Sequence, residues 1–173
     1  MLSQIEQLVS NKNQWLINQV DVEFPTPESI AGRDIYLQLQ ATQLFNTTAS
    51  HEFSDAQWVD EVIEVDFHRL TIMFSLLQAT QWEEGSDEQK LVIEFLTQII
   101  LDSEYQLYLG FIAGEPVAAL ISKVLPDENT ILFTDIVVSR AFKEQDKELA
   151  FAADVLHKLA AEKLTVNHII HPV

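Results

Sequence analysis

The C-terminal part of the chain carries an order of strand and turn signals that few folds accommodate. Three runs rich in apolar and β-branched residues lie between residues 105 and 138, separated by the turn signals "AGEP" and "LPDENT". Consecutive strands joined by short turns form an antiparallel meander. Apolar residues at helical spacing then predict a helix from about Gln145 to Lys163, and "LTVNHIIHPV" predicts a final strand. The predicted order of this part is β-β-β-α-β.

The first 104 residues predict mainly helices. Capping boxes, in which a Ser precedes a Glu or Gln by three residues, begin at Ser3, Ser54 and Ser86. The three helices that they predict run to about Gln19, over residues 55–81 and over residues 90–104. An extended segment, "VDVEFPTPES", and a further helix around residues 35–45 lie between the first two.

These patterns together predict an α+β fold, in which N-terminal helices pack on a mostly antiparallel sheet. We expect a single domain over residues 1–173, with a mainly helical portion at 1–104 and a sheet portion at 105–173. About half of the residues are apolar, which is enough for a substantial core.

Composition excludes several classes of protein. The chain has no Cys, so it has neither disulfides nor a Cys-based metal or redox site. Its start lacks the basic and apolar regions of a secretory signal, and no apolar run approaches the roughly 18 residues of a membrane span. We therefore expect a cytoplasmic protein that is not associated with a membrane.

The formal net charge of −17 restricts the partners of the chain. Nucleic acid is not expected, because binding phosphates needs clustered Lys and Arg. A basic protein or peptide is permitted as a partner. Acidity also keeps proteins soluble without any specific partner, so this alternative stays open.

Four segments follow one another between residues 105 and 173: "LYLGFIAGEPVAALISKVL", "TDIVVSRAFK", "ELAFAADVLHKLAAEKL" and "VNHIIHPV". In this order they resemble the GNAT family of acyl-CoA N-acyltransferases. In this family, the loop after the fourth strand holds the coenzyme A pyrophosphate on backbone N–H groups. If acyl-CoA binds here, the resemblance implies that Val137, Val138, Lys143 and Gln145 contact it. It also implies that Asp135 could take a proton from an attacking amine.

The chain departs from the family pattern in this loop. Three small positions of the family motif are Glu144, Asp146 and Glu148 here. Carboxylates a few ångströms from a pyrophosphate repel it by about 1 kcal/mol per pair even at a water-like dielectric constant. An acidic first turn instead suits the helix that follows, since it complements the helix dipole. We therefore expect a degenerate loop, in which side-chain carboxylates replace the bound anion.

A second departure is length. The family continues beyond the fifth strand with a helix that often carries a general-acid Tyr, whereas this sequence stops at Val173. No residue here is assigned that role.

Three functional hypotheses follow. The first is a GNAT-like domain without ordinary acyl-CoA binding, which serves as a binding or regulatory module and needs no cofactor. The second is a divergent N-acyltransferase that uses acetyl-CoA or another acyl-CoA and acts on a cationic amine. The third is an unrelated acidic protein that binds a protein partner. A V-shaped gap between the strands that end at Val138 and begin at His168 would favour GNAT kinship, and continuous pairing would exclude it.

The final strand raises a question of assembly. "VNHIIHPV" would lie at a sheet edge, and it has no Lys or Glu to protect that edge from other chains. We expect it to be covered, either by the segment near "VDVEF" of the same chain or by a second copy in a homodimer. No metal site is expected, because the spacing of His168 and His171 places them on opposite faces of a strand.

Overall fold

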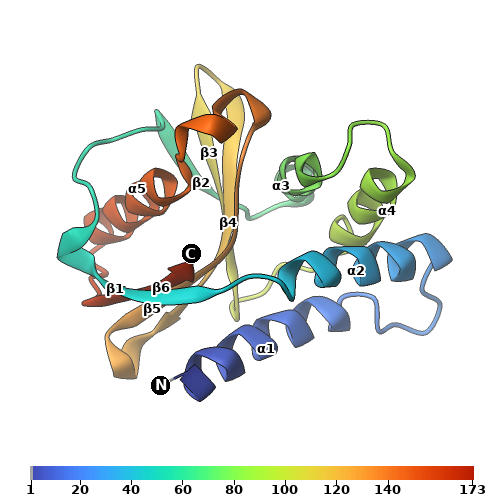
Figure 1. The fold of residues 1–173 in the computed structure, drawn as a ribbon, viewed down its shortest axis with the longest axis horizontal. Helices are drawn as coiled ribbons and strands as arrows, with labels where there is room; N and C mark the ends of the chain where they lie inside the picture. Colours follow the sequence, from blue (N-terminus) through green and yellow to red (C-terminus); the bar gives the residue numbers. More distant parts are fainter. Residues whose placement is uncertain (1) are drawn as a thin grey trace.

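Helices dominate the first hundred residues and strands dominate the remainder (Figure 1). The computed structural model describes the backbone of residues 2–173 and the side chains of residues 4–173. In chain order the elements are α1 (Leu2–Asn18), α2 (Pro27–Gln40), β1 (Phe45–Ala49), η1 (Ser50–Glu52), β2 (Glu61–Glu64), α3 (His68–Gln78), η2 (Ala79–Gln81), α4 (Asp87–Leu96), β3 (Gln106–Ile112), β4 (Glu115–Leu125), η3 (Pro126–Glu128), β5 (Thr130–Val138), η4 (Arg140–Gln145), α5 (Glu148–Ala161) and β6 (His168–Pro172), where η marks a 3₁₀ turn.

The strands form one six-stranded sheet in the order β1-β6-β5-β4-β3-β2. All neighbours are antiparallel except β5 and β6, which are parallel. Helix α5 lies on one face of the sheet, and α1 to α4 lie on the other (Figure 1). This arrangement confirms the predicted α+β fold with N-terminal helices.

Alternation along the strands builds a separate core on each face. Leu107 and Leu109 of β3 join the helices α1 to α4, whereas Tyr108 between them joins α5. Large side chains at the centre of the first core include Tyr36, Phe74 and Phe95. The second core is built around Phe133 and Phe151.

The predicted meander is confirmed, because β3, β4 and β5 follow one another as antiparallel neighbours. Its first turn uses Ala113 and Gly114, both of which have positive φ angles, as a two-residue hairpin of the twisted type requires. The predicted helix and final strand are also confirmed, as α5 and β6.

The prediction of a helix over residues 55–81 is wrong in its first half. The Oγ of Ser54 accepts a hydrogen bond from the N–H of Ala56 rather than from Gln57. Residues 61–64 form β2, which pairs with β3, and α3 begins only at His68. Pairing with a distant strand and packing on α5 outweigh the local helical pattern here.

The capping box at Ser86 is confirmed, since its Oγ accepts from the N–H of Gln89. Helix α4 ends at Leu96, earlier than predicted. The segment that follows is held by α1 and the residue after it: Trp15 Nε1 donates to Asp102, and Gln19 Oε1 accepts from the N–H of Ile100. The predicted first helix is confirmed as α1, but the side chain of Ser3 lies outside the described residues.

The final strand is covered by the same chain, but not by the expected segment. The "VDVEF" segment forms no strand, whereas β1, which was not predicted, pairs with β6 along its whole length. Strand β1 follows α2 after a short turn, so it reaches the sheet edge from the helical side.

Candidate functional site

A bulge in β5 creates the most unusual backbone position of the sheet. Ala119 pairs with Val137 and Ile121 pairs with Thr134, so β5 holds one residue more than β4 across this interval. Asp135 lies in this bulge with φ of +53°. Asp is one of the few residues with a side chain that enter this region without a large penalty. The bulge places the Asp135 side chain among the N-terminal helices.

The Asp135 carboxylate is bound by three side chains of the chain itself. Lys12 Nζ lies 2.6 Å from Oδ1, and the Tyr36 hydroxyl donates to Oδ2 at 2.5 Å. The Thr134 hydroxyl donates to Oδ1, while Gln78 Nε2 donates to the backbone carbonyl of Asp135 at 2.5 Å. The side chains of Lys12 and Asp135 are 1% and 0% exposed. We call these five residues the Asp135 cluster.

Burial sets the electrostatics of this cluster. Loss of hydration lowers the pKa of Lys12, although the Asp135 carboxylate opposes the shift by attraction and hydrogen bonding. Loss of hydration raises the pKa of Tyr36 well above its usual value, and the negative charge of Asp135 raises it further. Tyr36 is therefore a neutral donor to Asp135.

Asp135, which the family resemblance implies as a general base, is thus buried inside the protein. Asp135 lies in the bulge directly before the loop, but Lys12 and Tyr36 occupy its carboxylate oxygens. It lines neither cavity of this region. A role for Asp135 in proton transfer stays a prediction.

The loop after β5 is a 3₁₀ turn rather than an open cradle. It passes through η4, and Asp146 then adopts a left-handed conformation with φ of +51°. Helix α5 follows at Glu148, with no side-chain cap at its start. The first bond of this helix runs from the N–H of Phe151 to the carbonyl of Lys147, so the preceding N–H groups have no partner within the helix. The expected acidic residue in the first turn is present as Glu148.

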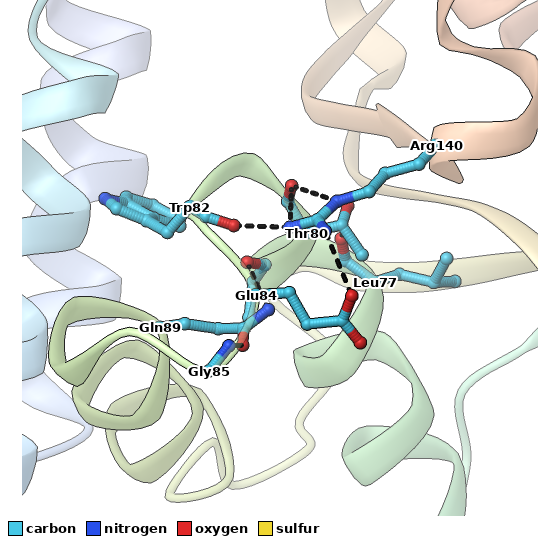
Figure 2. A network of polar contacts seen from close by, with 8 residues as sticks. Leu77, Thr80, Trp82, Glu84, Gly85, Gln89 and Arg140 are labelled. Atoms are coloured by element: carbon cyan, nitrogen blue, oxygen red, sulfur yellow. Dashed lines mark hydrogen bonds and ion pairs between the residues drawn. The ribbon is translucent and has the colours of Figure 1, made fainter.

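The side chain of Arg140, at the start of η4, contacts the segment that joins α3 to α4 (Figure 2). Its Nε and Nη2 both donate to the carbonyl of Thr80 at 3.2 Å, and Nη2 also donates to that of Trp82 at 2.5 Å. Its Nη1 lies 3.4 Å from a carboxylate oxygen of Glu84. Arg140 therefore fastens the loop to the segment between α3 and α4.

The parallel strands β5 and β6 part after three residue pairs. Pairing joins Thr130–Leu132 to His168–Ile170, while β5 continues to Val138 beside β4 alone. Pro172 has no N–H with which to extend the ladder. A gap at this position was the feature expected of GNAT kinship.

The strand arrangement is the one that the GNAT resemblance predicts.

A cavity of about 540 Å³ lies where the strands part. Its lining residues are Gln43, Ile136, Asp146, Glu148, Leu149, His171, Pro172 and Val173. We call it the gap cavity. A smaller cavity of about 190 Å³ adjoins it and shares Ile136 and Glu148; its other lining residues are Leu39, Thr80, Gln81, Val137, Val138, Arg140 and Lys143.

The family resemblance implies that four residues contact a cofactor, namely Val137, Val138, Lys143 and Gln145. Val137, Val138 and Lys143 come together around the smaller cavity, whereas Gln145 is exposed and lines neither cavity. Of the three loop carboxylates, Asp146 and Glu148 line the gap cavity and Glu144 does not.

Three solved structures superpose on most of this chain. A protein of unknown function from Staphylococcus epidermidis ATCC 12228 superposes with a TM-score of 0.52 at 11% identity, over 80% of this chain and 55% of that one. A GCN5-related N-acetyltransferase from Kribbella flavida superposes with a TM-score of 0.47 at 10% identity, over 80% and 52%. A tandem GNAT protein from the clavulanic acid biosynthesis pathway gives a TM-score of 0.46 at 8% identity, over 76% and 44%.

Such identities show a shared fold and nothing about activity, and the two scores below 0.5 carry no argument by themselves. This chain spans about half the length of each of these three structures. The sequence matches no protein-family model, and no curated protein matches it significantly.

Lys12, Tyr36 and Gln78 were not identified from the sequence as parts of a site. For Lys12 a signal existed. It lies at helical spacing within the apolar stripe formed by Ile5, Val9 and Leu16, where a solvated Lys is not expected. No comparable signal marks Tyr36 or Gln78, whose partners are 99 and 57 residues away along the chain.

The histidines do not gather into a site. His171 Nε2 lies 2.8 Å from the Thr48 hydroxyl, and its Nδ1 lies 2.9 Å from the carbonyl of Pro172. Among the residues that the structure describes, no group of three or more His, Asp or Glu is arranged to hold a metal ion. Within residues 2–173, no helix combines the length and the apolar character needed to cross a membrane.

Proposed function

We propose that this GNAT-like domain is a non-catalytic binding or regulatory module that has lost ordinary acyl-CoA binding and takes a basic protein or peptide as its partner. The observation that carries the proposal is the presence of the Asp146 and Glu148 carboxylates in the gap cavity. These groups give the cavity a charge opposite to the one that a pyrophosphate needs.

Electrostatics supports the loss of acyl-CoA binding. Each carboxylate that faces a phosphate a few ångströms away repels it by about 1 kcal/mol at a water-like dielectric constant, and by more in a shielded cavity. The nearby guanidinium of Arg140 offers little compensation, because its donors are directed at Thr80, Trp82 and Glu84. Lys143 remains as an exposed cation beside the smaller cavity.

The burial of Asp135 supports the absence of catalysis. A general base must come within about 2.6–3.2 Å of the atom whose proton it removes, directly or through one water. At Asp135 that space is taken by Lys12 Nζ at 2.6 Å and the Tyr36 hydroxyl at 2.5 Å. A substrate amine would have to displace α1 to reach this carboxylate.

The lining of the gap cavity suits a cationic side chain with an apolar stem. Ile136, Leu149 and Val173 provide apolar surface beside the two carboxylates. The side chains of Lys and Arg have this combination of an alkyl stem and a charged head. A basic partner could therefore insert one such side chain where the strands part.

Calorimetric titration with acetyl-CoA at low salt tests the loss of the cofactor. We expect no saturable binding by the unaltered protein below about 1 mM, which corresponds to roughly −4 kcal/mol. The double variant Asp146→Asn, Glu148→Gln removes both charges at nearly constant shape, and we expect it to bind at least roughly tenfold more tightly, since each repulsion is worth about 1 kcal/mol. A matched variant, Glu23→Gln with Glu28→Gln, lines neither cavity and should leave binding unchanged. A micromolar Kd for the unaltered protein would overturn the proposal.

An oligolysine peptide tests the partner. We expect it to bind the unaltered protein and to lose more affinity with the Asp146→Asn, Glu148→Gln variant than with the Glu23→Gln, Glu28→Gln variant. The comparison separates the gap cavity from general attraction to an acidic surface. Equal losses in the two variants would contradict a partner site at the gap.

A second candidate function is N-acylation of a cationic amine. The volume of the gap cavity, about 540 Å³, favours it, because this size is typical of small-molecule sites. Release of free coenzyme A from acetyl-CoA in the presence of a polyamine would measure it. If the protein turns over acetyl-CoA and this turnover disappears in Asp135→Asn, N-acylation would be favoured over the binding module as the function. The third hypothesis, an unrelated acidic partner protein, expected a groove or flat face in place of parted strands and is disfavoured by the fold.

A further inference from the structure

Strand β1 covers β6 but is itself left at the edge of the sheet. Its register shows which of its backbone groups are free. The carbonyl of Leu44 accepts from the N–H of Val173 at 2.8 Å, and the N–H of Ser50 donates to the carbonyl of Asn167 at 2.9 Å. In an antiparallel pair, hydrogen bonding alternates along the strand. The even-numbered residues of β1 therefore direct their backbone N–H and C=O groups toward β6. The odd-numbered residues direct theirs outward.

The outward residues are Phe45, Thr47 and Ala49. Phe45 lies opposite Pro172. Since proline has no N–H, this pair exchanges no hydrogen bonds, which agrees with the outward direction of the Phe45 backbone groups. Each of the three presents one N–H and one C=O beyond the edge. Among the described residues, none of these groups has a hydrogen-bond partner. The edge is ready to receive a further strand.

The two edges of the sheet differ in how they are protected. Strand β2, at the far edge, carries Glu61 and Glu64 at its ends, so a second acidic strand would be repelled there. Strand β1, "FNTTA", has no charged residue, no Pro and no bulge, and its neighbours from Gln43 to Ser50 are also uncharged. The usual devices that keep a strand from pairing with other chains are missing at β1.

We propose that β1 pairs antiparallel with β1 of a second copy of this chain, about a two-fold axis at Thr47. Phe45 then lies opposite Ala49 of the other copy, so the same three residues on each side satisfy one another, as two-fold symmetry requires. The sheet continues across the contact into the second copy.

The absence of charged side chains on β1 suits an equally uncharged strand, which a second copy supplies. Two molecules with a net charge of −17 repel each other, and this repulsion is smallest where neither presents carboxylates. Strand β1 is such a place, and it offers a basic strand no charge to pair with. Leu44 and Val173, which are 75% and 77% exposed, lie at one end of the edge and add apolar surface to the contact.

The variant Thr47→Pro tests the contact by removing one outward N–H. Proline is tolerated on an edge strand where its N–H would face solvent, so pairing with β6 is retained. We expect light scattering over a concentration series to show a dimer for the unaltered protein and for Thr47→Val, and only a monomer for Thr47→Pro. Unfolding curves and circular dichroism of Thr47→Pro establish that the fold is intact. Higher salt should strengthen the dimer, because it screens the repulsion between two acidic copies.

Amide hydrogen exchange tests the contact residue by residue, because neighbouring N–H groups of β1 point in opposite directions. The N–H groups of Thr47 and Ala49 should exchange rapidly in dilute solution and become protected as concentration rises. Those of Asn46 and Thr48 face β6 and should be protected at every concentration. A strict monomer at high concentration and high salt would overturn the proposal. A dimer that persists in Thr47→Pro would equally overturn β1 as the contact.

Discussion

At the scale of single residues, the most unusual feature of the molecule is the buried ion pair between Lys12 and Asp135. Both charges are almost completely removed from water, and each is the other's only ionic partner among the described residues. Removing two charges from water costs several kcal/mol each, which mutual attraction and further hydrogen bonds must offset. Tyr36 and Thr134 supply these bonds to the carboxylate. The pair therefore makes docking of α1 on the sheet sensitive to either residue.

Lys12→Met should destabilise the protein by about 3–5 kcal/mol, because it leaves the Asp135 carboxylate buried without a counter-charge. The double variant Lys12→Met, Asp135→Asn removes both charges and should be more stable than Lys12→Met alone. Denaturant unfolding measures each free energy.

Lys158→Met is the matched control, since Lys158 forms a partly exposed ion pair with Glu162 one helical turn away. Such pairs contribute about 0.3–0.5 kcal/mol, so a small loss is expected there. Equal losses for Lys12→Met and Lys158→Met would contradict a coupled buried pair.

At the scale of elements, the contact between α2 and α4 depends on Gly32. A methyl group added at this position would lie 1.8 Å from the Leu91 carbonyl oxygen and 3.0 Å from Cβ of Phe95. The first of these atoms belongs to the backbone of α4, so it cannot move aside as a flexible side chain can. The absence of a side chain at Gly32 lets the two helices lie close together.

Gly32→Ala should therefore destabilise the protein, although Gly→Ala inside a helix normally stabilises by roughly 0.5–1 kcal/mol. We expect a loss of about 1–3 kcal/mol, typical of overpacking, measured by denaturant unfolding. Gln38→Ala on the exposed side of α2 is the control and should change stability by less than about 0.5 kcal/mol. A stabilised Gly32→Ala would show that α2 and α4 are not in close contact.

The segment between β1 and β2 also shows how elements depend on one another. It joins strands at opposite edges of the sheet, and its contacts show that it crosses on the α5 side. On the way, the N–H groups of Trp58 and Val59 donate to the Asp154 carboxylate on α5. Asp154 is nearly buried, and these bonds satisfy it. The crossing segment is thus tied to α5.

At the scale of the whole molecule, all three tyrosines are protected from ionisation. Burial raises the pKa of Tyr105 to about 12, with help from the nearby charges of Glu104 and Asp102. Burial also raises the pKa of Tyr108, and burial with the charge of Asp135 raises that of Tyr36. The unfolded chain would ionise its tyrosines near pH 10.

Stability should consequently fall as pH rises above about 10.5. In this range the folded chain holds more protons on its tyrosines than the unfolded chain, so the free energy of unfolding decreases with pH. The lowered pKa of Lys12 acts in the opposite direction, because the unfolded Lys keeps its proton longer, but this effect ends near pH 10.5. Unfolding at a series of alkaline pH values measures the decline.

Ultraviolet absorbance of phenolate provides the direct check. The native protein should show little phenolate at pH 10.5, whereas the same chain in denaturant should be more than half ionised. A native titration with a midpoint near pH 10 would contradict the burial of the tyrosines.

Local signals were sufficient for the elements whose cause lies within a few residues. The meander follows from strand runs and from turn residues such as Gly114, which has a positive φ angle. Helix α4 begins where Ser86 caps it, and α5 follows from apolar spacing. Asp135 was proposed from the family resemblance, whereas the loop with Asp146 and Glu148 follows from the predicted ends of the strand and the helix around it. These features depend on backbone preference and periodicity, which the sequence displays directly.

Tertiary structure alone decided the features whose cause lies far along the chain. Strands β1 and β2 are five and four residues long, and they exist because β6 and β3 pair with them. Lys12 meets Asp135 only when α1 docks on the bulge of β5. A short strand gains its hydrogen bonds, and a buried ion its counter-charge, only from a distant partner, so neither the edge strands nor the sealing of Asp135 could be predicted from local pattern.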